Sequence, residues 1–426
     1  MEIKIEKLVY GGKGIGRIEN KVYFVPFVLP EEIVEIKVIK DKKKFAEAIP
    51  LKIIKPNPKR IQPPCEYFSI CGGCDYQHIN YENQLGIKKE IFKELMERIG
   101  KIKIENVEII PSQNPFYYRN RVQFKIQGNK VGFYKKESNE VVDIDRCILL
   151  KKDLSDLPLK IKNILAKMKF SLKELHFFSS TKNEVLIKFT FPKKIKEFPF
   201  DLKQIKNQLK INVAGIGLYF KNKKGFLERF KLFGKDFVVE DVENYKYRVS
   251  MDSFFQVNIF QYKNLIKLLK NELKDKKYKK IADLYCGVGL LTFPASEFCE
   301  KCIGIEASKS AIKDANYNKK LNKKGNIQFY NLDIKKSVDL LIKENPELII
   351  VDPPRTGIEK EFLKNINKIK NLRKIIYISC NPSTLARDLS KLKEFEFEIK
   401  ETKLIDMFPQ TYHIESFVVL EKNPSL

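Results

Sequence analysis

Residues 280–289 of this chain, KIADLYCGVG, decide its fold. The first six letters predict an apolar strand, and the Cys-Gly-Val-Gly that follows turns this strand into a helix. Glycines at such a turn let the backbone approach a ligand closely. Leu290 and Leu291 follow directly, so the third glycine of a dinucleotide-binding loop is absent. The shortened loop suits S-adenosylmethionine, which has no pyrophosphate, and it argues against an NAD-dependent dehydrogenase.

Acidic residues mark the ends of the strands that follow. Glu306 ends the strand CIGIE about twenty positions beyond the turn, where an acid can hold ribose hydroxyls. Asp333 and Asp352 close two further apolar segments, although each acid on its own could simply cap a helix. Ligands of such sheets bind beyond the carboxyl ends of the strands. We therefore expect one crevice to collect Asp283, Glu306, Asp333, Asp352 and Cys380.

Two late segments point to covalent chemistry. Cys380 lies in YISCNP (377–382), and Glu415 lies in HIES (413–416) near the C-terminus. A thiolate is a nucleophile, and a carboxylate can act as a base. Together with the cofactor loop, this pair indicates covalent catalysis on an electrophilic ring. The cysteine alone would say little.

The charge of the chain indicates a polyanionic partner. Its 426 residues include 81 Lys and Arg against 54 Asp and Glu, a formal net charge of +27. Nucleic acid is the commonest such partner, and 18 tyrosines with 31 phenylalanines could add stacking surfaces. A lysine-rich surface imposed by genome composition or by life at high temperature gives the same charge, so that interpretation stays open.

No segment predicts export or membrane insertion. The N-terminal MEIKIEKLVYGGKG lacks the apolar core of a signal peptide, and no uncharged stretch is long enough to cross a bilayer. Eight cysteines in a chain of this length indicate reduced thiols rather than a disulfide framework. We therefore expect a cytoplasmic protein with no membrane partner, and nothing in the sequence demands more than a monomer.

The length predicts two or three domains, and the sequence pattern divides the chain into three. Residues 1–57 alternate like short strands around a glycine run at 11–16, which predicts a small basic β-barrel of oligonucleotide-binding type. The run lacks the spacing and the Lys-Ser/Thr ending of a phosphate loop. Residues 58–240 mix strand and helix patterns and predict a central α+β domain. Residues 241–426 predict an α/β domain.

Four cysteines of the central domain can converge on one metal centre. Cys65, Cys71 and Cys74 lie together in CEYFSICGGC (65–74), and Cys147 follows at a distance. The two glycines let the backbone fold tightly enough to point both flanking sulfurs inward. Zinc and a [4Fe–4S] cluster both accept four thiolates, and the local spacing does not separate them.

These motifs together resemble the RNA uracil-C5 methyltransferases, specifically the iron–sulfur branch that modifies bacterial 23S ribosomal RNA. The resemblance covers nearly the full length and rests on the TRAM-like barrel, the Cys-x5-Cys-Gly-Gly-Cys motif, FQVN (255–258), DPPR (352–355), SCNP (379–382) and the terminal His-x-Glu-Ser. It implies an S-adenosylmethionine-dependent enzyme with a Rossmann-like class I methyltransferase domain, forming 5-methyluridine. Two alternatives stay open: methylation of transfer RNA by the same residues, and a non-catalytic RNA-binding protein with structural zinc.

The resemblance also implies roles for single residues. It makes Cys380 the nucleophile and Glu415 the base. It assigns the cofactor contacts to Gln256, Tyr285, Glu306, Asp333 and Asp352, and a [4Fe–4S] cluster to Cys65, Cys71, Cys74 and Cys147. Tyr285 stands where some relatives have phenylalanine and can still stack, whereas Leu290 stands where some have asparagine and offers no polar group. Residues 84–115 are expected to pack on the catalytic domain.

Overall fold

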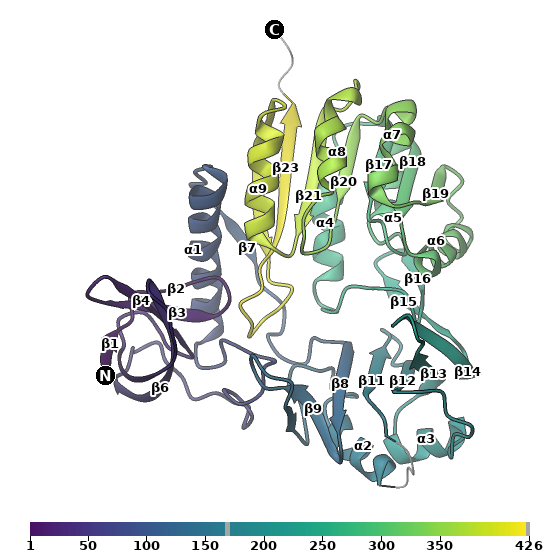
Figure 1. Ribbon diagram of the computed structural model, residues 1–426. Coiled ribbons are helices and arrows are strands. Elements are labelled where there is room, and N and C mark those ends of the chain that lie inside the picture. The colour runs from purple at the N-terminus through teal and green to yellow at the C-terminus, as the bar shows by residue number, and fades with distance from the viewer. Residues whose placement is uncertain (167–170, 423–426) are drawn as a thin grey trace.

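The computed structural model describes residues 1–166 and 171–422, which form three units (Figure 1). A small β unit at the N-terminus lies beside a long helix, a mixed sheet forms the centre of the chain, and an α/β unit follows it. None of the helices in the described residues is long and apolar enough to cross a membrane.

The N-terminal unit is a six-stranded sheet curled around a small apolar core (Figure 1). Its strands lie in the order β1-β5-β6-β4-β3-β2. Val34 and Ile36 point into the core while Lys37 is exposed, so the period-two pattern of the sequence sets the inner face. The strands are β1 (Glu2–Lys4), β2 (Lys7–Leu8), β3 (Lys13–Ile18), β4 (Lys21–Pro26), β5 (Ile33–Asp41) and β6 (Phe45–Lys55).

The central unit is a seven-stranded sheet in the order β10-β9-β8-β11-β12-β13-β14, with two helices covering one face (Figure 1). Phenylalanines of the strands and apolar side chains of both helices form one buried cluster. The elements are β8 (Arg121–Gln127), β9 (Lys130–Tyr134), β10 (Val141–Asp143), α2 (Leu157–Leu165), β11 (Glu174–Ser179), β12 (Val185–Phe191), α3 (Leu202–Leu209), β13 (Val213–Lys221) and β14 (Leu227–Gly234). A hairpin of β15 (Phe237–Val242) and β16 (Tyr245–Ser250) leads out of this unit.

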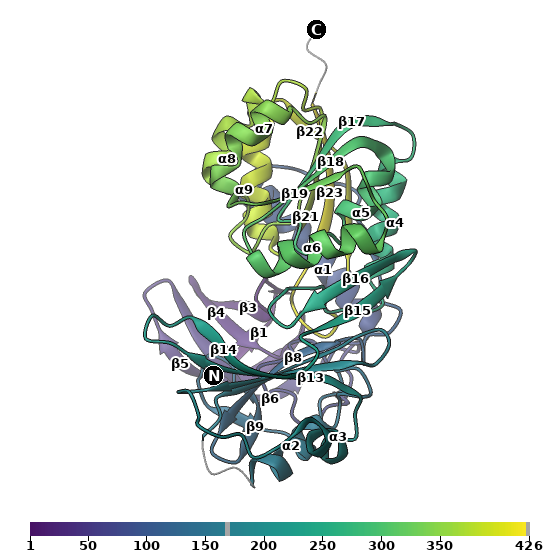
Figure 2. The ribbon, with the colours of Figure 1, turned by 90° about the vertical axis from the view of Figure 1, so that its right-hand side faces the viewer.

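The C-terminal unit is built on an eight-stranded sheet in the order β19-β18-β17-β20-β21-β23-β22-β7. Helices lie on both faces (Figure 2), and every residue of β20 is therefore buried. The strands from β19 to β21 are parallel, whereas β23 is antiparallel to both of its neighbours. The strands are β17 (Tyr278–Leu284), β18 (Cys299–Glu306), β19 (Ile327–Asn331), β20 (Leu348–Val351), β21 (Lys374–Ser379), β22 (Phe397–Ile405) and β23 (Glu415–Lys422).

The helix predicted after the glycine turn is short. It is α5 (Thr292–Ala295), which continues as a 3-10 turn at Ser296–Phe298. The other helices are α4 (Tyr262–Leu273), α6 (Lys309–Leu321), α7 (Val338–Glu344), α8 (Lys360–Asn365) and α9 (Pro382–Lys393), with further 3-10 turns at Ile334–Lys336 and Ile366–Lys368.

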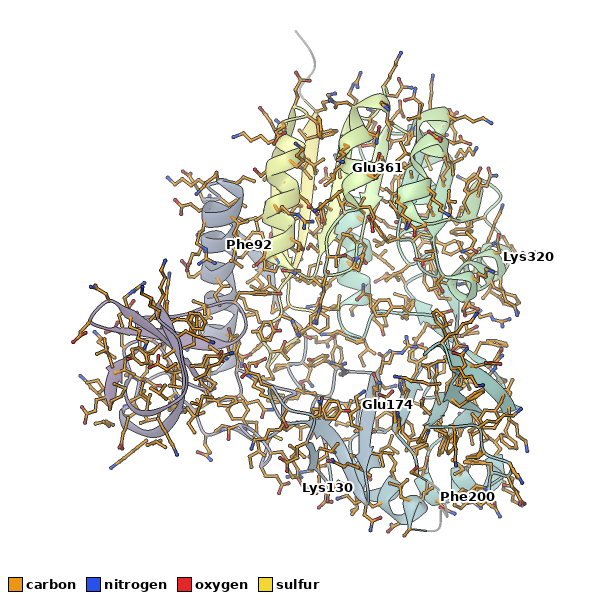
Figure 3. All side chains as sticks on the ribbon, in the orientation of Figure 1. Phe92, Lys130, Glu174, Phe200, Lys320 and Glu361 are labelled. Atoms are coloured by element: carbon orange, nitrogen blue, oxygen red, sulfur yellow. The ribbon has the colours of Figure 1, made fainter. Side chains whose placement is uncertain are left out.

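A segment from the N-terminal half of the chain completes the C-terminal unit. The long helix α1 (Tyr81–Gly100) packs on α9, and β7 (Glu108–Ile110) pairs in parallel with the edge strand β22. Phe92, labelled on α1 in Figure 3, is fully buried in the apolar cluster that includes α9. The helices approach closely at Gly100, where a Cβ atom would lie 2.9 Å from the carbonyl oxygen of Ala386.

Candidate active site

The parallel strands bring the predicted side chains to one edge of the sheet. Asp283 and Glu306 lie at the ends of β17 and β18, Asp333 follows β19, Asp352 follows β20, and Cys380 follows β21. These five strands are neighbours and run in the same direction, so their carboxyl ends share one edge.

A small cavity of about 50 Å³ opens at this edge. Gln256, Tyr285, Asp352 and Asp283 line it, together with the glycine turn. The Gln256 side-chain amide donates to a carboxylate oxygen of Asp352 at 3.3 Å. Burial raises the pKa of Asp352 to about 7, and the hydrogen bond from Gln256 opposes that rise. Phe254, which the sequence analysis did not single out, also lines the cavity and is 63% exposed.

Glu306 and Asp333 do not line this cavity, and each is held by backbone hydrogen bonds. Glu306 accepts from the N–H of Gly287 at 3.2 Å and from that of Ser308 at 2.7 Å. The glycine turn is thereby tied to the end of β18. Asp333 accepts from the N–H of Lys335 at 3.1 Å, so its carboxylate caps a 3-10 turn.

Strand pairing brings Cys380 and Glu415 together, although they are 35 positions apart in the sequence (415 − 380). Ser379 at the end of β21 is paired with Ser416 on β23, and the Ser416 hydroxyl donates to the Ser379 carbonyl at 3.2 Å. Cys380 follows the first serine and Glu415 precedes the second, so both side chains belong to the same end of the pair. Glu415 is 3% exposed, and Cys380 is half-buried.

The charges of Asp352 and Arg355 shift the pKa values of both Cys380 and Glu415. Burial is the main cause that raises the pKa of the Cys380 thiol to about 12, and the charges of Glu415 and Asp352 add to it. Burial also raises the pKa of Glu415 well above its ordinary value, with Asp352 adding to the effect. Arg355 lowers both pKa values. The thiol is therefore protonated at neutral pH, and burial disfavours ionisation of the Glu415 carboxyl.

The structure adds two aromatic neighbours, Tyr412 and Tyr10, that the sequence analysis did not place at the site, and it packs them beside His413 of the HIES segment. A guanidinium nitrogen of Arg355 lies 3.3 Å from Nε2 of His413. Burial, reinforced by Arg355, lowers the pKa of His413 to about 3, so its ring stays neutral. Tyr412 packs against His413, with ring centroids 4.3 Å apart, and Tyr10 of the N-terminal unit packs against Tyr412. No local sequence signal marks Tyr10, because only tertiary docking brings it here.

The four cysteines of the central domain line a separate cavity of about 170 Å³. Cys65, Cys71, Cys74 and Cys147 share it with apolar neighbours such as Phe68. The Gln77 amide donates to the Cys74 sulfur at 3.1 Å. Burial raises the pKa of all four thiols, that of Cys71 to about 12.

The four thiols share this cavity, but the structure does not arrange them as a metal site. Among the described residues, no group of three or more His, Cys, Asp or Glu side chains is arranged to hold one metal ion. A single zinc ion needs four sulfurs at about 2.3 Å from one point.

The fold, an open sheet with a cavity at the carboxyl ends of its strands, is that of the S-adenosylmethionine-dependent methyltransferases, as its likeness to a solved structure of this class shows. Residues 80–423 match the family described as tRNA (Uracil-5-)-methyltransferase, and residues 1–51 match the TRAM domain. The chain belongs to this family of RNA uracil-C5 methyltransferases.

The chain is similar over nearly its whole length to curated relatives and to a solved structure. The chain is 44% identical to an uncharacterized RNA methyltransferase of Aquifex aeolicus, covering 99% of this chain and 98% of the relative. An uncharacterized RNA methyltransferase of Thermotoga maritima is 31% identical, with 99% of each covered. The crystal structure of Pyrococcus abyssi tRNA (uracil-54, C5)-methyltransferase in complex with S-adenosyl-L-homocysteine is 26% identical, with a TM-score of 0.78, covering 99% of this chain and 100% of that one. The predicted multidomain α/β fold with an N-terminal TRAM domain and a C-terminal methyltransferase domain is confirmed.

Proposed function

We propose that this enzyme transfers a methyl group from S-adenosylmethionine to C5 of a uridine in 23S ribosomal RNA through a covalent adduct with Cys380. The observation that carries the proposal is the pairing of Ser379 with Ser416, which puts a nucleophile and a buried carboxyl side by side at the cofactor edge of the sheet.

The chemistry requires both groups. C5 of uracil is too weak a nucleophile to take a methyl group unaided. Addition of the Cys380 thiolate to C6 forms a C–S bond and an enolate, which loads electron density onto C5. C5 then attacks the methyl group, and S-adenosylhomocysteine leaves. Glu415 removes the remaining proton from C5, the C–S bond breaks, and the thiolate and 5-methyluridine are released.

The raised pKa values set the starting state of this sequence. Cys380 must lose its proton before it adds to C6, and Glu415 must be ionised before it can accept one. Arg355 is the cation whose charge lowers both pKa values.

The cofactor and RNA would be held by different parts of the chain. We assign S-adenosylmethionine, which supplies the methyl group, to Gln256, Tyr285, Glu306, Asp333 and Asp352. Residues 1–57 form the RNA-binding barrel, residues 58–240 the central domain and residues 241–426 the catalytic domain, with residues 84–115 packed on the last. A uridine within folded RNA must be flipped out to reach Cys380. The net charge of +27 supports RNA binding that weakens as salt rises.

We further propose a [4Fe–4S] cluster on Cys65, Cys71, Cys74 and Cys147. A shared cavity of about 170 Å³ and a hydrogen bond from Gln77 to one sulfur support it. No step above needs an electron, so the cluster would hold the central domain in shape. Structural zinc in a non-catalytic RNA-binding protein would leave the arrangement of Cys380 and Glu415 without a purpose.

Transfer RNA is the second candidate substrate. It is favoured by the likeness to the Pyrococcus abyssi enzyme, whose name specifies uracil 54 of tRNA. The four-cysteine cavity and the motifs shared with the iron–sulfur branch favour 23S ribosomal RNA. We propose that the enzyme acts as a monomer in the cytoplasm.

Tritium release from RNA labelled at C5 of uracil tests both the proposed substrate and the proposed covalent mechanism. Anaerobically purified protein is incubated with S-adenosylmethionine and either unmodified 23S ribosomal RNA or transfer RNA. Release from ribosomal RNA that is absent in Cys380→Ala and retained in Cys299→Ala, which alters a buried cysteine elsewhere, supports the proposal. Release from transfer RNA alone overturns the substrate and keeps the mechanism. No release from either overturns the mechanism as well.

A further inference from the structure

A tight turn of the barrel reaches the catalytic edge. It joins β2 to β3 and is closed by hydrogen bonds from the N–H of Val9 to the Lys13 carbonyl, 2.9 Å, and from the N–H of Gly12 to the Val9 carbonyl, 3.2 Å. Gly12 has a φ of +79° and packs on Asp75, where a Cβ atom would lie 3.0 Å from the Asp75 side chain. Glycine at position 12 therefore lets the turn pack closely on Asp75, whereas a residue with a side chain would be strained there.

Tyr10 lies at the tip of this turn. Its ring meets the ring of Tyr412 edge to face, with centroids 5.3 Å apart and an interplanar angle of 89°. Asp75, on which the turn rests, accepts from the backbone N–H of Tyr412 at 3.2 Å. Two contacts thus fix the turn to the loop that leads into Glu415. An aromatic pair of this geometry contributes about 0.5–1.5 kcal/mol beyond the burial of its area.

The hydroxyl of Tyr10 has no hydrogen-bond partner among the described residues, and its side chain is only half-buried. Burial raises its pKa above the ordinary value, and the nearby Tyr412, Cys380 and Glu415 add to that rise, while Arg355 opposes it. The phenol therefore stays protonated. It is a free hydrogen-bond donor on a turn that packs against Tyr412, in the loop that leads into Glu415.

We propose that Tyr10 forms part of the nucleobase pocket and donates its hydroxyl hydrogen bond to a carbonyl oxygen of the target uracil. This inference rests on the proposed function. Addition of a thiolate at C6 shifts negative charge onto a carbonyl oxygen of the ring, and a donor fixed in advance stabilises that charge. The RNA-binding barrel then contributes directly to the catalytic pocket, so a base is fully contacted only when the barrel is docked.

The Tyr10→Phe variant removes the hydroxyl and keeps the ring that packs on Tyr412. Its effect is measured as the single-turnover rate of covalent adduct formation with RNA carrying 5-fluorouridine at the target position, at saturating RNA and S-adenosylmethionine. Fluorine replaces the proton that the base would remove, so the adduct accumulates and can be counted on a denaturing gel. Tyr23→Phe is the matched control, because Tyr23 lies in the core of the same barrel.

We expect the adduct to form about tenfold more slowly in Tyr10→Phe, as for the loss of one hydrogen bond, with unchanged cofactor affinity and an unchanged rate in Tyr23→Phe. An equal rate in Tyr10→Phe and the wild-type enzyme overturns the role of Tyr10 while the methyltransferase mechanism stands. A loss confined to RNA affinity also overturns it, because that result places Tyr10 in docking alone. Absence of adduct in the wild-type enzyme overturns the covalent mechanism and this inference with it.

Discussion

Lys88 on α1 and Asp406 after β22 form a buried ion pair, with Nζ and Oδ1 2.6 Å apart and side chains 1% and 0% exposed. Lys88 also donates to the carbonyl of Phe408 at 3.0 Å. One helix residue thereby fixes the loop that runs from β22 to Glu415. On the same helix, Gln84 donates to the side chain of Gln410 at 3.0 Å, so the loop has two buried anchors.

Lys88→Met should destabilise the C-terminal unit by about 3–5 kcal/mol, because it leaves the Asp406 carboxylate buried without its cation. Urea unfolding measures the change. The double variant Lys88→Met/Asp406→Leu should recover most of the loss, since it removes both charges together. Lys89→Met, on the same helix and without a salt bridge among the described residues, is the control. A single variant as stable as the wild-type protein contradicts the anchoring role.

Cys380 should react slowly with iodoacetamide at neutral pH. Its pKa is raised to about 12 by burial and by Glu415 and Asp352, so at pH 8 its thiolate is on the order of 10³ times scarcer than that of an ordinary cysteine. The rate, followed by mass spectrometry of the peptide that contains Cys380, should still be rising at pH 9. Arg355→Gln should slow it further, because this cation lowers the pKa.

Arg373→Gln is the control for the alkylation measurement. Arg373 directly precedes β21 and Cys380 directly follows it, so the two residues lie at opposite ends of this strand. It should leave the alkylation rate unchanged. A plateau below pH 8 in the wild-type protein would mean that the thiol ionises readily, contrary to the buried, acid-flanked setting of Cys380.

Glu306→Gln should weaken S-adenosylmethionine binding about tenfold, as measured by calorimetry. The carboxylate joins Gly287 to Ser308 through two backbone N–H groups and is the acid expected to hold ribose hydroxyls. An amide can accept only through one atom, so one of these bonds is lost. Glu300→Gln, exposed on the same strand, should bind the cofactor as the wild-type protein does. Equal affinities in the two variants would remove Glu306 from the cofactor site.

Gln77→Leu should lower the reduction potential of the protein loaded anaerobically with iron and sulfide. Gln77 accepts from the N–H of Cys65 at 3.2 Å and donates to the Cys74 sulfur at 3.1 Å. Hydrogen bonds to cluster sulfurs stabilise the more negative, reduced state, so their removal favours the oxidised one. Iron content should stay at about four atoms per chain, as expected for a [4Fe–4S] cluster. Gln123→Leu, at an exposed position of β8, is the control, and a bound zinc ion would show no reduction at all.

The grouping of side chains at the carboxyl ends of the parallel strands could be predicted from sequence, because each strand and the residue that ends it are recognisable in a short segment. Asp283, Glu306, Asp352 and Cys380 each follow or end an apolar run, and the rule that ligands bind at the carboxyl ends is enough to group them. That Cys380 and Glu415 belong to one site was expected from the family resemblance. The register that joins them was not predictable, since it depends on β23 inserting antiparallel between β21 and β22.

Long-range docking limited the rest of the prediction. Tyr10 is one aromatic among many in the chain, and only the contact of its turn with Asp75 and Tyr412 brings it to the catalytic edge. Lys88 and Asp406 form an ion pair across more than 300 positions, which no periodicity reveals. Lys88 lies on α1, which packs on α9 from outside the strand–helix repeats of the C-terminal unit.

Asp283 should make the C-terminal unit less stable as pH rises through the neutral range. Its side chain is 1% exposed and accepts from the Thr292 hydroxyl at 2.5 Å, and burial raises its pKa to about 7 from an unfolded value near 3.8. Well below pH 3.8 both states are protonated and its contribution is fully present. Between about pH 4 and 7 the unfolded chain has lost a proton that the folded protein keeps, so stability falls with pH.

Asp283→Asn removes this titration and should be measured without cofactor. The Tm of the variant minus that of the wild-type protein should increase between pH 5 and pH 8, because only the wild-type protein loses stability from this group. A shift of about three pKa units corresponds to about 4 kcal/mol in full, of which about 3 kcal/mol falls between pH 5 and pH 8. Glu300→Gln, which alters an exposed carboxylate, should show a constant difference. A constant difference for Asp283→Asn as well would mean that this carboxyl ionises normally, and that the surroundings of Asp283 are more polar than its burial implies.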